Sequence, residues 1–162
     1  YTYLEKTFGD QITLVRQGLS DKEEERTFYI SNSSTISTFS GEWIDKVREG
    51  NRLFDICSTV QKHVEGNGFS IVREFVGHGI GRQLHEEPQI PNFGPPGKGP
   101  RLVVGQVLAI EPMVNAGGYA VITRPDGWTV ATKDGRLSAH FEHTVAVGPE
   151  GPEILSVLPD GQ

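Results

Sequence analysis

The sequence is poor in the features that build a disulfide scaffold, a membrane span or a nucleic-acid-binding surface. Its only cysteine, Cys57, cannot form an internal disulfide, so a reducing, cytoplasmic location is expected. No apolar run of 18 residues and no charged-then-apolar leader are seen, so neither a membrane span nor a signal peptide is expected. Fifteen basic and 21 acidic side chains give a net charge of −6 without a Lys/Arg cluster, which argues against a nucleic acid or an anionic membrane as partner.

The remaining composition is that of an ordinary globular protein, with 36% hydrophobic and 22% charged residues. A compact chain of this size buries about two-thirds of the surface that it exposes when unfolded, which is enough for one core. All ten prolines follow Gly66, so the early and late parts of the chain differ in character.

Local patterns predict an α+β domain with a mainly antiparallel sheet. Ile56, Val60 and Val64 recur every four residues between Asp55, the expected N-cap, and a glycine-rich stop at 66–68, which predicts a helix. Strands are expected at 11–16, 69–75, 107–114, 119–123, 128–132, 141–147 and 153–157. The charged run at 20–26 favours a solvated helical turn, and the Ser/Thr-rich stretch at 31–40 a loop.

Two carboxylates stand where apolar residues are expected. Glu111 interrupts the apolar run at 107–114, and Glu142 follows Phe141 just before another such run. An ionised carboxylate inside a sheet is costly unless it is paired, protonated or bound to a cation. Alternation puts Glu111 on the same face of its strand as Ala109 and Met113, and Glu142 on the same face of its strand as His140 and Thr144. If the two strands are neighbours, both carboxylates and the His140 imidazole converge. His143 points the other way, and we expect it either to pack or to support the site indirectly.

His78 is the third unusual residue, because glycines at 77, 79 and 81 surround it and predict a tight bend that leaves the imidazole unobstructed. Together, His78, Glu111 and Glu142 offer one nitrogen and up to four oxygens, a donor set suited to Mn²⁺, Fe²⁺, Co²⁺ or Zn²⁺. Satisfied structural polar groups remain an alternative for all three. His85 precedes a Pro/Gly-rich segment that suits a pocket wall or an ordinary surface connection.

Seven segments, in this order, resemble the C-terminal half of bacterial type I methionine aminopeptidases: 50–53, 63–65, 76–82, 84–88, 91–94, 107–113 and 138–145. The resemblance implies a pita-bread fold, a dinuclear metal centre and removal of methionine from peptide or nascent-protein N-termini. It further implies that His78, Glu111 and Glu142 are metal ligands, with Glu142 bridging both ions, and that His85 contacts the scissile peptide. In this reading Glu111 also handles a proton, and His140 is assigned to substrate binding with His85.

The first 49 residues depart from the family pattern. The family's two aspartate ligands fall at Val15, which cannot bind a cation, and at Glu23, which could. We therefore expect one weakly held divalent ion instead of two, and reduced or lost activity. We predict a diverged or foreign segment, 1–49, packed on the sheet of the aminopeptidase-like half, 50–162, within one structural domain.

An incomplete pocket half would expose apolar surface, so self-association or a complementing chain is expected. Two other interpretations stay open: a catalytically inert binding module with the same fold, and an artificial chimera. The mismatch before Gly50 and the absence of an initiator methionine motivate the chimera.

Overall fold

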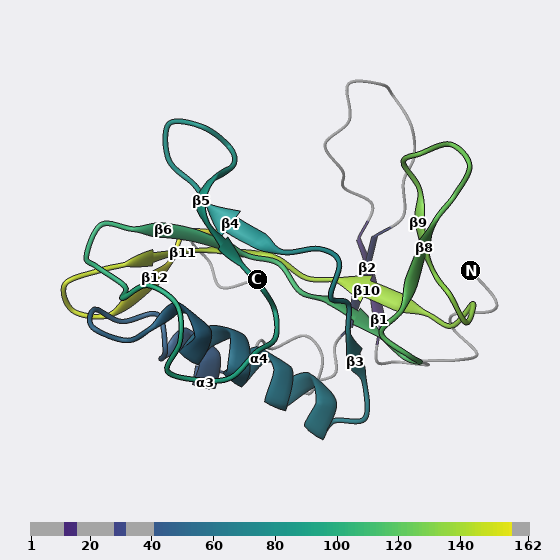
Figure 1. Ribbon diagram of the computed structural model, residues 1–162, viewed down its shortest axis with the longest axis horizontal. Helices are drawn as coiled ribbons and strands as arrows, with labels where there is room; N and C mark the ends of the chain where they lie inside the picture. Colours follow the sequence, from purple (N-terminus) through teal and green to yellow (C-terminus); the bar gives the residue numbers. More distant parts are fainter. Residues whose placement is uncertain (1–11, 16–27, 32–40, 157–162) are drawn as a thin grey trace. The chain divides into compact units, whose positions relative to one another are not determined.

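The computed structural model describes residues 12–15, 28–31 and 41–156 (Figure 1). The chain divides into two compact units, 1–40 and 41–162. In the first unit, β1 (Ile12–Val15) pairs antiparallel with β2 (Phe28–Ser31), which confirms the strand predicted at 11–16. The turn predicted at 20–26 and the loop predicted at 32–40 lie outside the described residues. The predicted boundary at residue 49 and the packing of the first part on the sheet stay predictions.

The predicted helix is α4 (Leu53–Gly66), which follows the short α3 (Gly41–Ile44). Its apolar stripe is buried as expected. The N-cap prediction was wrong, because the cap is Arg52 and Asp55 lies three residues into the helix. From there the Asp55 carboxylate accepts a hydrogen bond of 2.8 Å from the backbone N–H of Arg52, so it satisfies the helix start from inside.

The second unit is built on antiparallel strands, which confirms the α+β prediction. Its largest sheet has the order β12-β11-β6-β4-β5, and a smaller sheet has the order β10-β7-β3. These strands are β3 (Ser70–Ile71), β4 (Gly77–Gly79), β5 (Glu86–Ile90), β6 (Val107–Ile110), β7 (Met113–Asn115), β10 (Ser138–His140), β11 (His143–Val147) and β12 (Pro152–Ile154). A separate hairpin joins β8 (Val121–Thr123) to β9 (Val130–Thr132). None of the described helices is long and apolar enough to cross a membrane.

The two faces of the large sheet differ in what covers them. Helices α3 and α4 lie on one side of it (Figure 1). On β6 and β11, every second side chain points toward these helices and forms the core there. These side chains are all at most 1% exposed: Leu108, Ile110, Val145 and Val147. The intervening side chains, which include Ala109 and Thr144, face away from this core because successive side chains of a strand alternate. We call the first the covered face and the second the open face.

The pairing register of β6 with β11 continues in that of β7 with β10. Between the two pairs of strands, Glu111 and Pro112 interrupt the hydrogen-bonded pairing. Ile110 pairs with His143 before the interruption, and Met113 pairs with His140 after it. The predicted strands 107–114 and 141–147 are therefore each shorter than expected. Across the interruption the Phe141 N–H still donates to the Pro112 carbonyl at 3.1 Å, so the register is kept. That register puts Glu111 opposite Glu142.

Candidate functional site

His78 lies in a β-strand, so the predicted bend was wrong. Strand β4 pairs with β5 on one side and β6 on the other, and His78 is the partner of Ala109. A side chain at Gly77 would collide with the Ala109 carbonyl, and one at Gly79 with the Glu87 carbonyl. The glycines are thus needed for the close approach of neighbouring strands and not for a turn.

The hydrogen bond at Nδ1 determines which nitrogen of the His78 imidazole is left to face the cluster. Nδ1 lies 2.8 Å from the Gly79 carbonyl oxygen, which can only accept, so Nδ1 carries the proton. The opposite nitrogen, Nε2, faces Glu111 Oε1 at 3.3 Å. In a neutral ring Nε2 presents a lone pair, and two acceptors in contact repel. This arrangement is stable only with a proton on Nε2 or with a cation between the two groups.

Glu111 faces a second imidazole with its other oxygen. Oε2 lies 3.4 Å from His140 Nε2, so one carboxylate lies between two histidines. The Glu111 side chain is 17% exposed and that of His140 is 45% exposed, so the cluster opens to solvent on the His140 side. This contact confirms the sequence prediction that His140 converges with Glu111 if their strands are neighbours.

Glu142 completes the open-face cluster by register and not by a direct contact. Continuing the register of the flanking pairs puts it opposite Glu111, and it is itself exposed. The structure thus brings His78, Glu111 and His140 into contact and places Glu142 across from Glu111. Glu23 lies outside the described residues, and Val15 pairs with Phe28 in the first unit.

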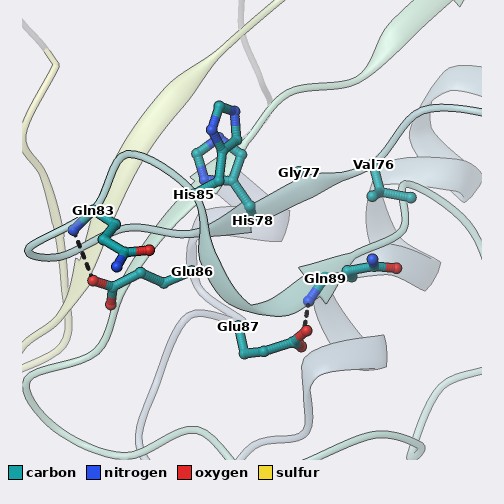
Figure 2. Close-up of a pocket in the computed structure, with 8 residues that line it drawn as sticks. All are labelled: Val76, Gly77, His78, Gln83, His85, Glu86, Glu87 and Gln89. Atoms are coloured by element: carbon teal, nitrogen blue, oxygen red, sulfur yellow. Dashed lines mark hydrogen bonds between the residues drawn. The ribbon is translucent and has the colours of Figure 1, made fainter.

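A pocket of about 600 Å³ adjoins His78 (Figure 2). Its wall comes from β4, β5 and their connection, and it includes His85, whose ring centroid is 4.2 Å from that of His78. The Pro/Gly-rich segment at 92–100, for which a pocket wall was one of two interpretations, contributes no residue to this wall. Hydrogen bonds from Gln83 N to Glu86 Oε1 (2.9 Å) and from Gln89 N to Glu87 Oε2 (3.3 Å) shape this wall.

His143 lies on the covered face, which confirms its packing role. Its ring stacks on that of Trp43 at 6.5 Å between centroids, and its Nδ1 lies 2.9 Å from Ser156 Oγ. Burial lowers the pKa of this imidazole, with a smaller opposing effect from the Glu142 charge. On the same side of the sheet, burial in α4 raises the pKa of the Cys57 thiol to about 12. Neither group is prepared for chemistry.

The donor set of the open face suits a transition-metal ion, with one imidazole nitrogen and two carboxylates. The His78 Nε2 atom directed at the Glu111 carboxylate, 3.3 Å away, is the observation that fits a cation best. Over the described ranges, however, no three His, Cys, Asp or Glu side chains already stand in the geometry of a metal site. Hence the ligand roles of His78, Glu111, Glu142 and Glu23 and the substrate roles of His85 and His140 stay predictions.

Comparisons with known proteins agree on one family of metallopeptidases. The sequence pattern of metallopeptidase family M24 matches residues 36–149. A methionine aminopeptidase of Clostridium perfringens is 56% identical over 141 residues, which are 87% of this chain and 55% of that protein. Methionine aminopeptidase 1 of Bacillus subtilis is 56% identical over 113 residues, or 70% of this chain and 46% of that protein.

Solved structures agree with the sequence relatives. The crystal structure of methionine aminopeptidase from Thermotoga maritima matches with a TM-score of 0.71 and 42% identity, covering 82% of this chain and 56% of that one. This confirms the pita-bread-like fold. The chain spans about half the length of the relatives that it matches.

Proposed function

This chain belongs to metallopeptidase family M24, and on that premise we propose that it is a methionine-aminopeptidase-like metalloprotein that holds one divalent cation and has reduced or no peptidase activity. Its substrate class is a peptide or nascent-protein N-terminus, and its location is the cytoplasm. The family relationship and the methionine aminopeptidase names of the relatives support this proposal, as does the free, buried Cys57 for the location.

One observation carries the cation part of the proposal. The Glu111 carboxylate lies between two imidazole nitrogens at 3.3 and 3.4 Å, and the nearer one, on His78, has its proton on the far side of the ring. His78 and Glu111 would hold a divalent ion between them, which would relieve the repulsion of two facing acceptors. Glu142, across the ladder, adds a second anionic oxygen donor.

The chain's own residues then have separate tasks. Bound there, the cation would supply a Lewis acid that polarises the scissile carbonyl and makes a water molecule nucleophilic at neutral pH. Glu111 accepts a proton at its carboxylate and passes it to the leaving amine. His85, exposed on the pocket wall beside His78, donates a hydrogen bond to the developing oxyanion, and His140 orients the peptide.

The proposed loss of one ion follows from the donors that are missing. Val15 takes the place of one family aspartate and offers no oxygen, which leaves one site with a much weaker ligand set than the other. We expect the remaining ion to be held by His78, Glu111 and Glu142, with Glu23 as a further donor. Poorer positioning of the substrate then lowers activity.

Calorimetric titration with Mn²⁺ and Co²⁺ tests this proposal, followed by an assay for release of methionine from Met-Ala-Ser. One equivalent of ion that binds to the native chain, and no longer binds after His78→Ala, is the expected result. The matched control is His63→Ala, on α4. No heat with either ion would remove the metal site, and two equivalents would remove the single-ion proposal. Binding without methionine release would favour the inert binding module, and light scattering at 17.8 kDa would exclude self-association.

A further inference from the structure

Arg73 holds an unusual position in the loop that connects β3 to β4. Its guanidinium carbon lies 4.4 Å from the ring centroid of Tyr119 and 5.2 Å from that of Phe93. Phe93 comes just after β5, whose Gln89 lines the pocket, and Tyr119 comes just before β8. Three loops that are distant in sequence therefore meet at one cation.

Both rings lie beside the guanidinium carbon of Arg73. Among the described residues, the guanidinium nitrogens of Arg73 make no hydrogen bond or ion pair. The neighbouring Glu74 carboxylate is engaged instead with the backbone N–H of Arg73, at 3.1 Å. Arg73 is exposed, cation–π attraction holds its guanidinium near the two rings, and its planar fork of N–H donors matches a carboxylate.

The backbone of Arg73 also lies close to that of His140. Val72 donates a hydrogen bond of 3.0 Å to the Met113 carbonyl, and Met113 is the ladder partner of His140. Two strand spacings of ~4.8 Å and one residue of ~3.3 Å separate the backbones of Arg73 and His140, or roughly 10–13 Å. An extended peptide covers this distance in about three or four residues.

We propose that the edge of the Arg73 guanidinium, oriented by Tyr119 and Phe93, binds the carboxylate of an acidic side chain three to five residues from the N-terminus of a bound peptide. The surroundings make such a contact selective. The acidic residues near the pocket, such as Glu86 and Glu87, repel an acidic peptide, so Arg73 decides where along the peptide a carboxylate is accepted. This inference rests on the proposed function for its peptide and not for the anion contact.

The first test uses amidated hexapeptides that begin with Met-Ala and carry Glu or Gln at the third, fourth or fifth position, titrated into the full chain and followed by NMR. We expect one Glu peptide to bind about three- to tenfold more tightly than its Gln counterpart. That preference disappears in Arg73→Met and weakens in Arg73→Lys, which keeps the charge but not the fork. Arg124→Met removes the same charge from the β8–β9 hairpin and leaves the preference intact.

A second test does not depend on peptide binding. Glutarate is titrated at constant ionic strength, and the Nε–H signal of Arg73 is followed with inorganic phosphate as the competing probe. A saturating shift with glutarate is expected. The proposal is overturned by no shift, by a larger response to phosphate, or by a Glu preference that survives in Arg73→Met. If glutarate binds while neither peptide does, the peptide function fails and the anion site stands.

Discussion

Glu142 and His143 are adjacent in the chain, yet they lie on opposite faces of one sheet and in opposite chemical situations. On the covered face His143 is stacked on Trp43, and burial lowers its pKa. On the open face Glu142 is exposed across the ladder from Glu111, which lies between two imidazoles. Burial favours neutral forms on one side, and clustering of donors favours a bound cation on the other. The comparison shows that adjacent residues can differ fully in role: His143 packs on the covered face, and Glu142 is a candidate metal ligand.

The largest expected effect is the loss of cation affinity when a donor is removed from the open face. Glu111→Gln keeps the shape of the side chain but replaces an anionic ligand with a neutral amide, so Mn²⁺ affinity is expected to fall on the order of 100-fold. Titration calorimetry measures this, with Glu153→Gln on β12 as the matched control. Equal affinities in the two variants would show that Glu111 binds no ion. Far-ultraviolet circular dichroism checks that both variants are folded.

On the covered face the expected effect is on stability instead. Leu108 is 0% exposed, so Leu108→Ala leaves a cavity and is expected to cost about 3 kcal/mol of unfolding free energy. Thr144→Ala, on the open face of the neighbouring strand, is expected to cost about 1 kcal/mol or less. Urea denaturation of both variants measures the difference. A greater cost for Thr144→Ala would reverse the assignment of the faces.

The buried thiol of Cys57 makes the stability of the covered face depend on pH. Because burial raises the pKa of Cys57 from 9.0 to about 12, the unfolded chain loses this proton first as the pH rises. The contribution of Cys57 to stability is fully present below pH 9 and declines from about pH 9 to about pH 12. Between pH 8 and 10 we expect a loss of about 1 kcal/mol that is absent in Cys57→Ala, measured by urea denaturation.

The smallest expected effect concerns the start of the helix that covers the sheet. Asp55 accepts hydrogen bonds from the backbone N–H groups of Arg52 at 2.8 Å and Gly97 at 2.7 Å. Asp55→Ala leaves both donors unsatisfied and is expected to cost about 1 kcal/mol. Lys62→Ala, at an exposed position of the same helix, serves as the control in thermal unfolding. The cation affinity should not change, since this contact lies outside the open-face cluster.

The sequence supports some of these features better than others. Glu111 and Glu142 can be found because a carboxylate in an apolar strand is conspicuous and period-two alternation assigns its face. The strand at His78 cannot be found in this way, because its glycines suggest a turn, whereas close packing against two carbonyls is what requires them. Alternation also anticipates the contact of His140 with Glu111 once their strands are neighbours. The packing of Arg73 depends on which loops meet, and a local pattern carries no such information.

The unbroken register across Glu111 and Pro112 has a consequence for how this chain tolerates insertions and deletions. Losing or gaining one residue between Val107 and Asn115 would exchange the two faces for every side chain beyond the change, and Glu111 would be moved away from Glu142. The β8–β9 hairpin lies outside this ladder and can change length at its exposed tip without that penalty. In a library of length variants, survivors should therefore concentrate at 124–129 and be absent from 107–115.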